Sequence, residues 1–485
     1  MMFYLMSLFL LVGSFVTASA KGGRQGLWFG WLVAMLAMPI WVTFPFGSLT
    51  LDMRTVAGMV GLATVLIFPD PGREGDPGLR IRPLTLISDI VVGVLVLVQV
   101  YSQYRIGRFG PLTAPDIARR WVLPYVVGRC YFGSVDDIRR CLSISAKLLM
   151  GLSVFAVVEA ITKFHLVNRA LGKTYPILET GEGYRWGLKR AQGPLDHPIF
   201  FGMMLVLLYP FAYEVFREWR AGRGPRWWLW LLPTLSAAVI VTVSRGAQIS
   251  LVFTGLITFF FQKPRWRIAL FTFAVVGGTA GYVGKAVLTE ALGKLAEESE
   301  DDVRLIMIND EEYEYTGTKH RSLLFVAYDQ AFKDCDAFGF GFEMQGIELE
   351  EAVALRFSSI DNHFIKFFLQ YGYVGLSCFI ILAFTSLINL GILGWDVKNP
   401  AAGFAGALFG ALMSVTVGLL SVWFAPDFGS VWLYCVGLAG NLRCLPLHVV
   451  PSGEDGEAKA RLEGPAPRRN RLNPAHAPIR AIQIM

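Results

Sequence analysis

The chain has 485 residues, of which 54% are hydrophobic and 17% are charged, and its formal net charge is +6. A soluble domain carries about 25% charged residues, so this composition excludes an ordinary soluble protein. Apolar runs of about 20 residues, each long enough to cross a bilayer as a helix, recur along the chain and predict an all-α polytopic membrane protein.

The apolar runs predict about 12–13 transmembrane helices. The first run lacks the basic residues of a signal peptide, so we expect it to be retained as a span. The run at 362–393 is long enough for a short helix, a break at Gly372 and then a span. The spans are expected near residues 2–19, 27–46, 53–69, 83–103, 115–133, 138–163, 198–217, 227–243, 246–262, 267–287, 362–393, 400–424 and 427–444.

These spans divide the chain into four parts. We expect an N-terminal bundle over 1–287, a large loop over 288–361, C-terminal helices over 362–445 and a disordered tail over 446–485. A second long loop lies near 164–197, and loops of this length are usually functional. The six cysteines show no CxxC or Cys/His spacing, so neither a disulfide framework nor a structural metal site is expected.

Basic residues in the short loops predict the orientation of the bundle, because cytoplasmic loops are rich in Lys and Arg. Two loops carry the strongest cytoplasmic markers, which are Arg217, Arg220, Arg223, Arg226, Lys263, Arg265 and Arg267. This orientation places the loops 164–197 and 288–361 on the outer face and the tail in the cytoplasm.

Arg245 interrupts the apolar stretch "AAVIVTVSRGAQISLVFTG". A charge at the bilayer centre is costly, so the Ser-Arg-Gly triplet is expected to be a turn between two spans. In the predicted topology this turn lies at the outer boundary, where an arginine is disfavoured. Arg245 then either ends a helix pair and binds lipid headgroups, or binds an anionic substrate.

Other cationic residues and histidines break the same rule on the outer face: Arg105, Arg108, Arg119, Arg120, Arg185, Lys189, Arg190, His165, His197, His320, Arg321 and His363. Guanidinium forks suit phosphate oxygens, which they bind through paired hydrogen bonds. A histidine whose pKa is near neutral suits the deprotonation of a hydroxyl group. The combination of arginines and histidines indicates group transfer from a diphosphate leaving group. The alternative anionic partner of the arginines is a lipid headgroup.

Four stretches carry a resemblance to a known family. They are "RAQGPLDHPIFFGMML", "SRGAQISL", "HRSLLFVAYDQAFKDCDAFGFGF" and "DNHFIKFFLQYGYVGL". In order, spacing and shared outer location they resemble the O-antigen ligase and O-antigen polymerase family of bacterial glycosyltransferases. The likeness covers about residues 190–375, with a similar number of spans before it.

The resemblance implies a glycan donor on a polyprenyl diphosphate, used at the periplasmic face of the bacterial inner membrane without a metal or other cofactor. Arg190, Arg245 and Arg321 would hold the diphosphate, and the large loop would shape the acceptor site. Structural alternatives remain for two of them. Arg190 could anchor the loop at the interface, and Arg321 could pair with the acidic run "EESEDDVRLIMINDEEYEY".

The general base has three candidates. The ligase branch has a histidine followed by asparagine where this chain has Asp361-Asn362, and His363 stands two positions after Asp361. The Asp-Asn form is more similar to the chain-polymerising members of the family. The base is therefore expected to be His363, Asp361 or His320. A lone histidine such as His363 is otherwise expected to be buried and hydrogen-bonded, and His197 fits a helix start as well as a site.

We therefore expect a metal-independent glycosyltransferase that polymerises a surface or exported polysaccharide. A ligase that transfers glycan to lipid A core or protein differs only in its acceptor. A polysaccharide or lipid transporter is the third alternative, disfavoured because the chain has no internal repeat and its unusual charges gather on one face. The expected partners are a polyprenyl-diphosphate-linked oligosaccharide, membrane lipids, a chain-length regulator and export machinery, and no nucleic acid.

Overall fold

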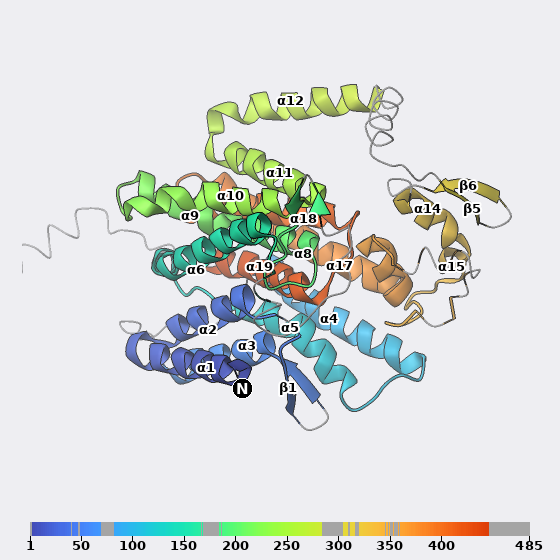
Figure 1. Ribbon diagram of the computed structural model, residues 1–485, viewed down its shortest axis with the longest axis horizontal. Coiled ribbons are helices and arrows are strands. Elements are labelled where there is room, and N and C mark those ends of the chain that lie inside the picture. The colour runs from blue at the N-terminus through green and yellow to red at the C-terminus, as the bar shows by residue number, and fades with distance from the viewer. Residues whose placement is uncertain are drawn as a thin grey trace, which may run out of the picture. The chain divides into compact units, whose positions relative to one another are not determined.

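The computed structural model describes most of the chain up to residue 445 (Figure 1). The described part folds almost entirely into helices, with three short two-stranded hairpins. The predicted tail over 446–485 lies outside the described residues. The structure describes residues 2–39, 41–46, 49–68, 82–165, 167, 184–185, 187–283, 304–308, 311–315, 320–344, 346–347, 349, 353, 357 and 359–445.

The helices follow one another in chain order with short connections. The first six are α1 (Met2–Lys21), α2 (Gly23–Ala37), α3 (Met53–Ile67), α4 (Pro83–Arg105), α5 (Thr113–Arg129) and α6 (Val135–Thr162). The next are α8 (Pro198–Leu207), α9 (Tyr209–Arg220), the 3-10 helix η3 (Arg226–Trp230), α10 (Leu231–Val241), α11 (Arg245–Gln262) and α12 (Pro264–Val283). The last are α14 (His320–Ala327), α15 (Asp329–Asp334), α17 (His363–Trp395), α18 (Ala402–Gly418) and α19 (Pro426–Cys444).

All strands are short and pair only with their neighbours in sequence. The three antiparallel hairpins join β1 (Thr43–Phe46) with β2 (Leu49–Asp52), β3 (Tyr184–Arg185) with β4 (Leu188–Lys189), and β5 (Arg304–Ile308) with β6 (Glu311–Tyr315). The last hairpin contains the second half of the predicted acidic run. The glutamates of β6 are exposed, so this part of the run forms a solvated face.

The all-α polytopic membrane class is confirmed. Within the described part, α4, α6 and α17 are each long and apolar enough to cross a membrane, and the bent pair α8–α9 would be a fourth span. Each of the other predicted spans also contains a helix, so the helical segments were placed correctly. The total of about 12–13 spans stays a prediction, as do the domain boundaries.

Proline and glycine decide where the helices depart from the apolar runs. The predicted span 27–46 is wrong at its C-terminal end. There α2 stops at Ala37, two residues before Pro39, and residues 43–46 form a strand. Pro210 lacks an N–H group, and the helix bends by 42° between α8 and α9 just before it. The predicted break at Gly372 is confirmed, because this residue has φ 64° and ψ −164° inside α17.

The C-terminal helices pack among earlier helices of the chain, with α19 against α5 and α18 against α11 (Figure 1). Gly128 of α5 and Gly437 of α19 let these two backbones touch. A Cβ atom on Gly128 would lie 2.2 Å from the carbonyl oxygen of Tyr434, and one on Gly437 would lie 2.1 Å from that of Tyr125. Small residues at such a crossing are typical of membrane helix pairs.

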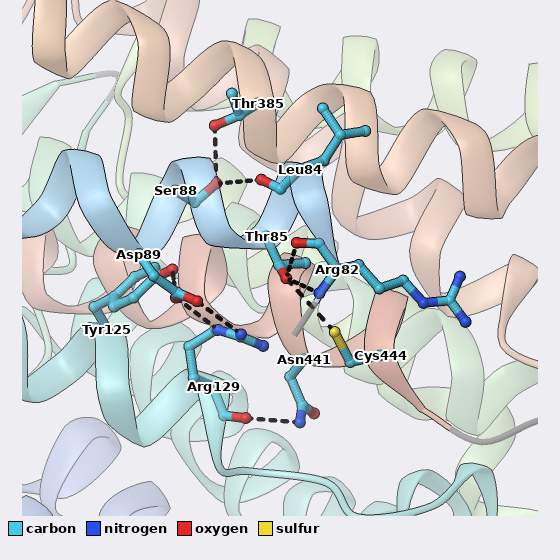
Figure 2. A network of polar contacts seen from close by, with 10 residues as sticks. All are labelled: Arg82, Leu84, Thr85, Ser88, Asp89, Tyr125, Arg129, Thr385, Asn441 and Cys444. Carbon is cyan, nitrogen blue, oxygen red and sulfur yellow. Dashed lines mark hydrogen bonds and ion pairs between the residues drawn. The ribbon is translucent and has the colours of Figure 1, made fainter. Parts of the chain in front are cut away.

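A polar cluster inside the bundle joins α4, α5 and α19, and Figure 2 shows Arg129 turned toward Asp89. Arg129 donates from Nε and Nη2 to the two carboxylate oxygens of Asp89, at 2.9 Å and 3.0 Å. Asn441 of α19 donates to the carbonyl oxygen of Arg129 at 2.8 Å. The paired hydrogen bonds compensate the burial of the Arg129 charge and help to set the position of α5.

The described part of the large loop has a hydrophobic core of its own. Ile308 of β5, Leu324 of α14 and Phe357 pack in this core against Ile365 and Leu369 of α17. The Tyr328 hydroxyl donates to the carbonyl oxygen of Phe357 at 2.9 Å. This packing holds the N-terminus of α14, with His320 and Arg321, close to the start of α17.

Candidate functional site

Four arginines line one cavity of about 360 Å³. Three of them, Arg190, Arg245 and Arg321, are the predicted diphosphate-binding residues, and the fourth is Arg185. We call this space the arginine cavity. Its remaining lining residues are His197, Ile199, Met203, Ser244, Gly246 and Ser421. The structure thus brings together arginines from two long loops and a helix turn.

Arg190 is positioned by contacts with the end of α10. Its side chain is 7% exposed, and Nε donates to the carbonyl oxygen of Thr242 at 3.3 Å. The next residue, Ala191, donates its backbone N–H to the carbonyl oxygen of Val241 at 3.1 Å. These contacts fasten the first long loop to the turn that contains Arg245.

The turn between α10 and α11 has an unusual backbone. Val243 has φ 49°, a left-handed conformation that a β-branched residue rarely adopts and that costs about 1–3 kcal/mol. Ser244 is the N-cap of α11, yet its side chain caps no backbone N–H. The first residues of α11, Arg245 and Gly246, line the cavity directly after this strained position.

Three helices begin at the arginine cavity. Its lining includes Ile199 from the first turn of α8, Arg245 from that of α11 and Arg321 from that of α14. The N-terminus of a helix carries a partial positive charge and unpaired N–H groups, and it favours bound anions. The helix dipoles therefore attract an anion into this cavity, as the four guanidinium groups do.

Four arginines that the sequence placed on the outer face lie outside the cavity and have acidic partners. Arg105 pairs with Asp336, Arg108 with Glu343, Arg119 with Asp52 and Asp116, and Arg120 with Asp116. Three arginines of the cavity differ. In the part of the chain that the structure describes, no carboxylate lies within 4.0 Å of a nitrogen of Arg185, Arg245 or Arg321. The cavity therefore gathers positive charge that an anion can neutralise.

His197 caps the start of α8 and also lines the arginine cavity, and its role in a functional site stays a prediction. Its Nδ1 accepts the backbone N–H of Ile199 at 3.1 Å. Burial, helped by the charge of Arg190, lowers the pKa of His197 to about 4. The ring is neutral at pH 7 with its proton on Nε2, and it can donate a hydrogen bond but not act as a base through Nδ1.

None of the three predicted bases lines the arginine cavity. Asp361 is half-buried, accepts a hydrogen bond from the Ser359 hydroxyl at 2.9 Å, and acts electrostatically on both His197 and His320. His320 stacks on Phe357, with ring centroids 5.0 Å apart. Burial lowers the pKa of His320, and the charge of Asp361 opposes this shift.

His363 lies in different surroundings. Its imidazole stacks on Phe424 with centroids 4.9 Å apart, and Phe367 and Phe379 pack around it. It lines a second cavity, and within the described residues its Nε2 has no hydrogen-bond partner. The expectation of a buried and hydrogen-bonded histidine is thus correct in its burial, while the ring nitrogen Nε2 is left unpaired.

Arg185 is the arginine of the cavity that the sequence placed on the outer face but did not assign to the diphosphate. It lies in β3 and pairs with Leu188 of β4 across a tight turn at Gly187, which has φ 74°. A glycine between two short strand-like segments is a hairpin signal that could have revealed this fold. The residues that the structure describes contain no cluster of three or more His, Cys, Asp or Glu side chains that could hold a metal ion.

Comparison with known proteins agrees with this geometry. A family model described as O-antigen ligase matches residues 230–380. The match includes Arg245, Arg321 and the three predicted bases, whereas Arg185 and Arg190 precede it. No curated protein matches the chain. The family match confirms the resemblance to the O-antigen ligase and O-antigen polymerase family, and it supports a function of the ligase or polymerase type in general.

Proposed function

We propose that this protein polymerises a polysaccharide at the periplasmic face of the bacterial inner membrane. It transfers a glycan from a polyprenyl diphosphate carrier to a hydroxyl group of another lipid-linked repeat unit. The observation that supports this most directly is the arginine cavity, which gathers four guanidinium groups, three of them without a carboxylate partner among the described residues.

The reaction forms one bond and breaks one bond. The acceptor hydroxyl oxygen attacks the anomeric carbon of the donor glycan, and the bond from that carbon to the diphosphate oxygen breaks. The electron pair of the broken bond stays on the diphosphate, whose growing charge Arg190, Arg245 and Arg321 stabilise. Fixed cations contribute most where charge develops in the transition state. Attack from the face opposite the diphosphate inverts the anomeric carbon.

The hydroxyl proton passes to a general base, and we assign this role to Asp361. Its carboxylate acts electrostatically on His197, which lines the arginine cavity, and on Lys366, which lines the second cavity. His363 and His320 are the alternatives. His363 lies in a ring stack and lines the second cavity, not the arginine cavity, and the stacking of His320 on Phe357 restricts its approach to a substrate.

The proposed reaction needs no metal, because the arginines supply the positive charge. The test uses purified protein in nanodiscs, a polyprenyl-diphosphate-linked oligosaccharide and EDTA, with products separated on a gel. A ladder of lengthening products supports a polymerase. One transfer product that appears only with added lipid A core replaces the polymerase by a ligase. If neither acceptor yields product in EDTA or with added Mg²⁺, the proposal of a glycosyltransferase is wrong.

A further inference from the structure

A second cavity of about 400 Å³ lies between α4, α5, α17 and α19. Six aromatic side chains line it: Trp121, Phe342, Phe367, Tyr371, Trp423 and Phe424. We call it the aromatic cavity. It shares no lining residue with the arginine cavity.

Buried polar atoms without partners mark the aromatic cavity as a binding site. Gln99, Gln103 and His363 line it, and their side chains are 2%, 8% and 4% exposed. Among the residues that the structure describes, Nε2 of each has no hydrogen-bond partner. Gln370, in the same cavity, does donate its amide to the carbonyl oxygen of Phe342 at 2.7 Å. Buried polar atoms are normally hydrogen-bonded, so three unpaired ones at one cavity call for a polar ligand.

The lining combines flat apolar rings with hydrogen-bonding side chains. A sugar ring matches this combination, because it has an apolar face of C–H groups and an edge of hydroxyl groups that both donate and accept. An acyl chain would contact the rings and leave the two glutamine amides unpaired. A diphosphate is matched less well, because Arg120 is paired with Asp116 and Lys366 lies over the Trp423 ring at 4.1 Å.

The two cavities lie on either side of one short connection. The segment between α18 and α19 contributes Ser421 to the arginine cavity and Trp423 to the aromatic cavity. The start of α17 is fastened to the same segment, because the His363 backbone N–H donates to the carbonyl oxygen of Leu419 at 2.9 Å. A sugar in the aromatic cavity would therefore lie near a donor whose diphosphate occupies the arginine cavity.

We propose that the aromatic cavity is the acceptor subsite, which binds the terminal sugar of the incoming glycan through Gln99, Gln103 and the rings of Trp121 and Trp423. This inference rests on the proposed transfer reaction. It adds the location of the acceptor and the residues that hold it.

The test separates the two subsites with a ligand that lacks a diphosphate. The probe is the free oligosaccharide of one repeat unit, released from its carrier and added to protein in nanodiscs, which contain no detergent sugars. Saturation-transfer NMR measures its binding to the wild type, to Gln99→Leu/Gln103→Leu and to Arg245→Ala. Gln330→Leu is the matched control, because it removes an exposed amide of α15 outside both cavities.

We expect the double variant to weaken oligosaccharide binding at least tenfold, while Arg245→Ala and Gln330→Leu bind like the wild type. The leucines remove unpaired polar groups, so the fold should persist. If the double variant does not fold, Gln103→Leu alone serves the same test. Binding that survives the glutamine changes, or that Arg245→Ala abolishes, overturns the subsite. The subsite is also overturned if the wild type makes product but does not bind the free oligosaccharide. A wild type that makes no product contradicts the transfer reaction itself.

Discussion

Arg190 donates a hydrogen bond to the carbonyl oxygen of Thr242, a residue 52 positions later in the chain. This contact joins the first long loop to the turn that precedes Arg245. Two arginines from separate segments thereby face one cavity in a defined relation. In the proposed reaction one diphosphate contacts both arginines, and this hydrogen bond helps to bring their two segments together.

Replacing Arg245 should test the arginine cavity most directly. We expect Arg245→Ala to lower kcat/KM about 100- to 1,000-fold, because it removes a fixed cation from the developing charge of the leaving group. Arg245→Lys should restore part of the rate, since it keeps the charge and loses the fork. The measurement is the initial rate of product formation. Arg108→Ala is the control, because Arg108 is exposed and lies outside the cavity. Equal losses in both variants would contradict a specific role for Arg245.

Arg185 should contribute to donor binding more than to the chemical step. Its side chain is exposed, so salt should screen its interaction with a diphosphate. We expect Arg185→Ala to raise the donor KM about tenfold at low salt, and the difference from the wild type to shrink at 1 M salt. A large loss of kcat with an unchanged KM would place Arg185 at the reacting bond instead.

The choice of base can be decided by comparing two variants that keep side-chain size. Asp361→Asn should lower kcat by about 100-fold or more, because the amide cannot accept the hydroxyl proton. His363→Gln should leave kcat within about tenfold, because His363 lies in a ring stack outside the arginine cavity. The reverse order of the two effects would assign the base to His363. Thermal melting of both variants checks that neither effect reflects unfolding.

His197 should make stability depend on pH. Its pKa is lowered to about 4 in the folded protein, from an ordinary value of 6.5. Between these values the unfolded chain binds a proton that the folded protein does not, so stability falls as the pH drops from 6.5 toward 4. The loss amounts to about 3 kcal/mol and levels off below the folded pKa.

Thermal melting of the wild type and of His197→Asn should reveal the pH-dependent contribution of His197 to stability. Asparagine is a good N-cap and has no titrating side chain. The melting temperature of the His197→Asn protein should therefore fall less than that of the wild type between pH 6.5 and pH 4. Identical pH profiles for the two proteins would show that His197 does not titrate as its surroundings indicate.

The contact between α5 and α19 should tolerate no added methyl group. We expect Gly437→Ala to destabilise the protein by about 1–3 kcal/mol, because the new Cβ would lie 2.1 Å from a backbone carbonyl oxygen. Gly151→Ala is the matched control in α6, since its Cβ would meet no atom within 4 Å. That variant should melt at or above the wild-type temperature. A Gly437→Ala protein as stable as this control would mean that the two backbones are not in close contact.

The sequence by itself determined the membrane class, the positions of the helices and the break at Gly372. These features depend on local properties, namely apolar length and the conformations open to proline and glycine. The family resemblance of the sequence also singled out Arg190, Arg245 and Arg321, which the structure brings to one cavity.

Only the tertiary structure decided which of the outer arginines are paired. Arg105 meets Asp336 across 231 residues and Arg119 meets Asp52 across 67, which leaves three arginines of the cavity without such a partner in the described part of the chain. It also showed that His363 lines the aromatic cavity and not the arginine cavity. Ion pairs and ring stacks join residues that are distant in sequence, and their partners are chosen by how the helices pack.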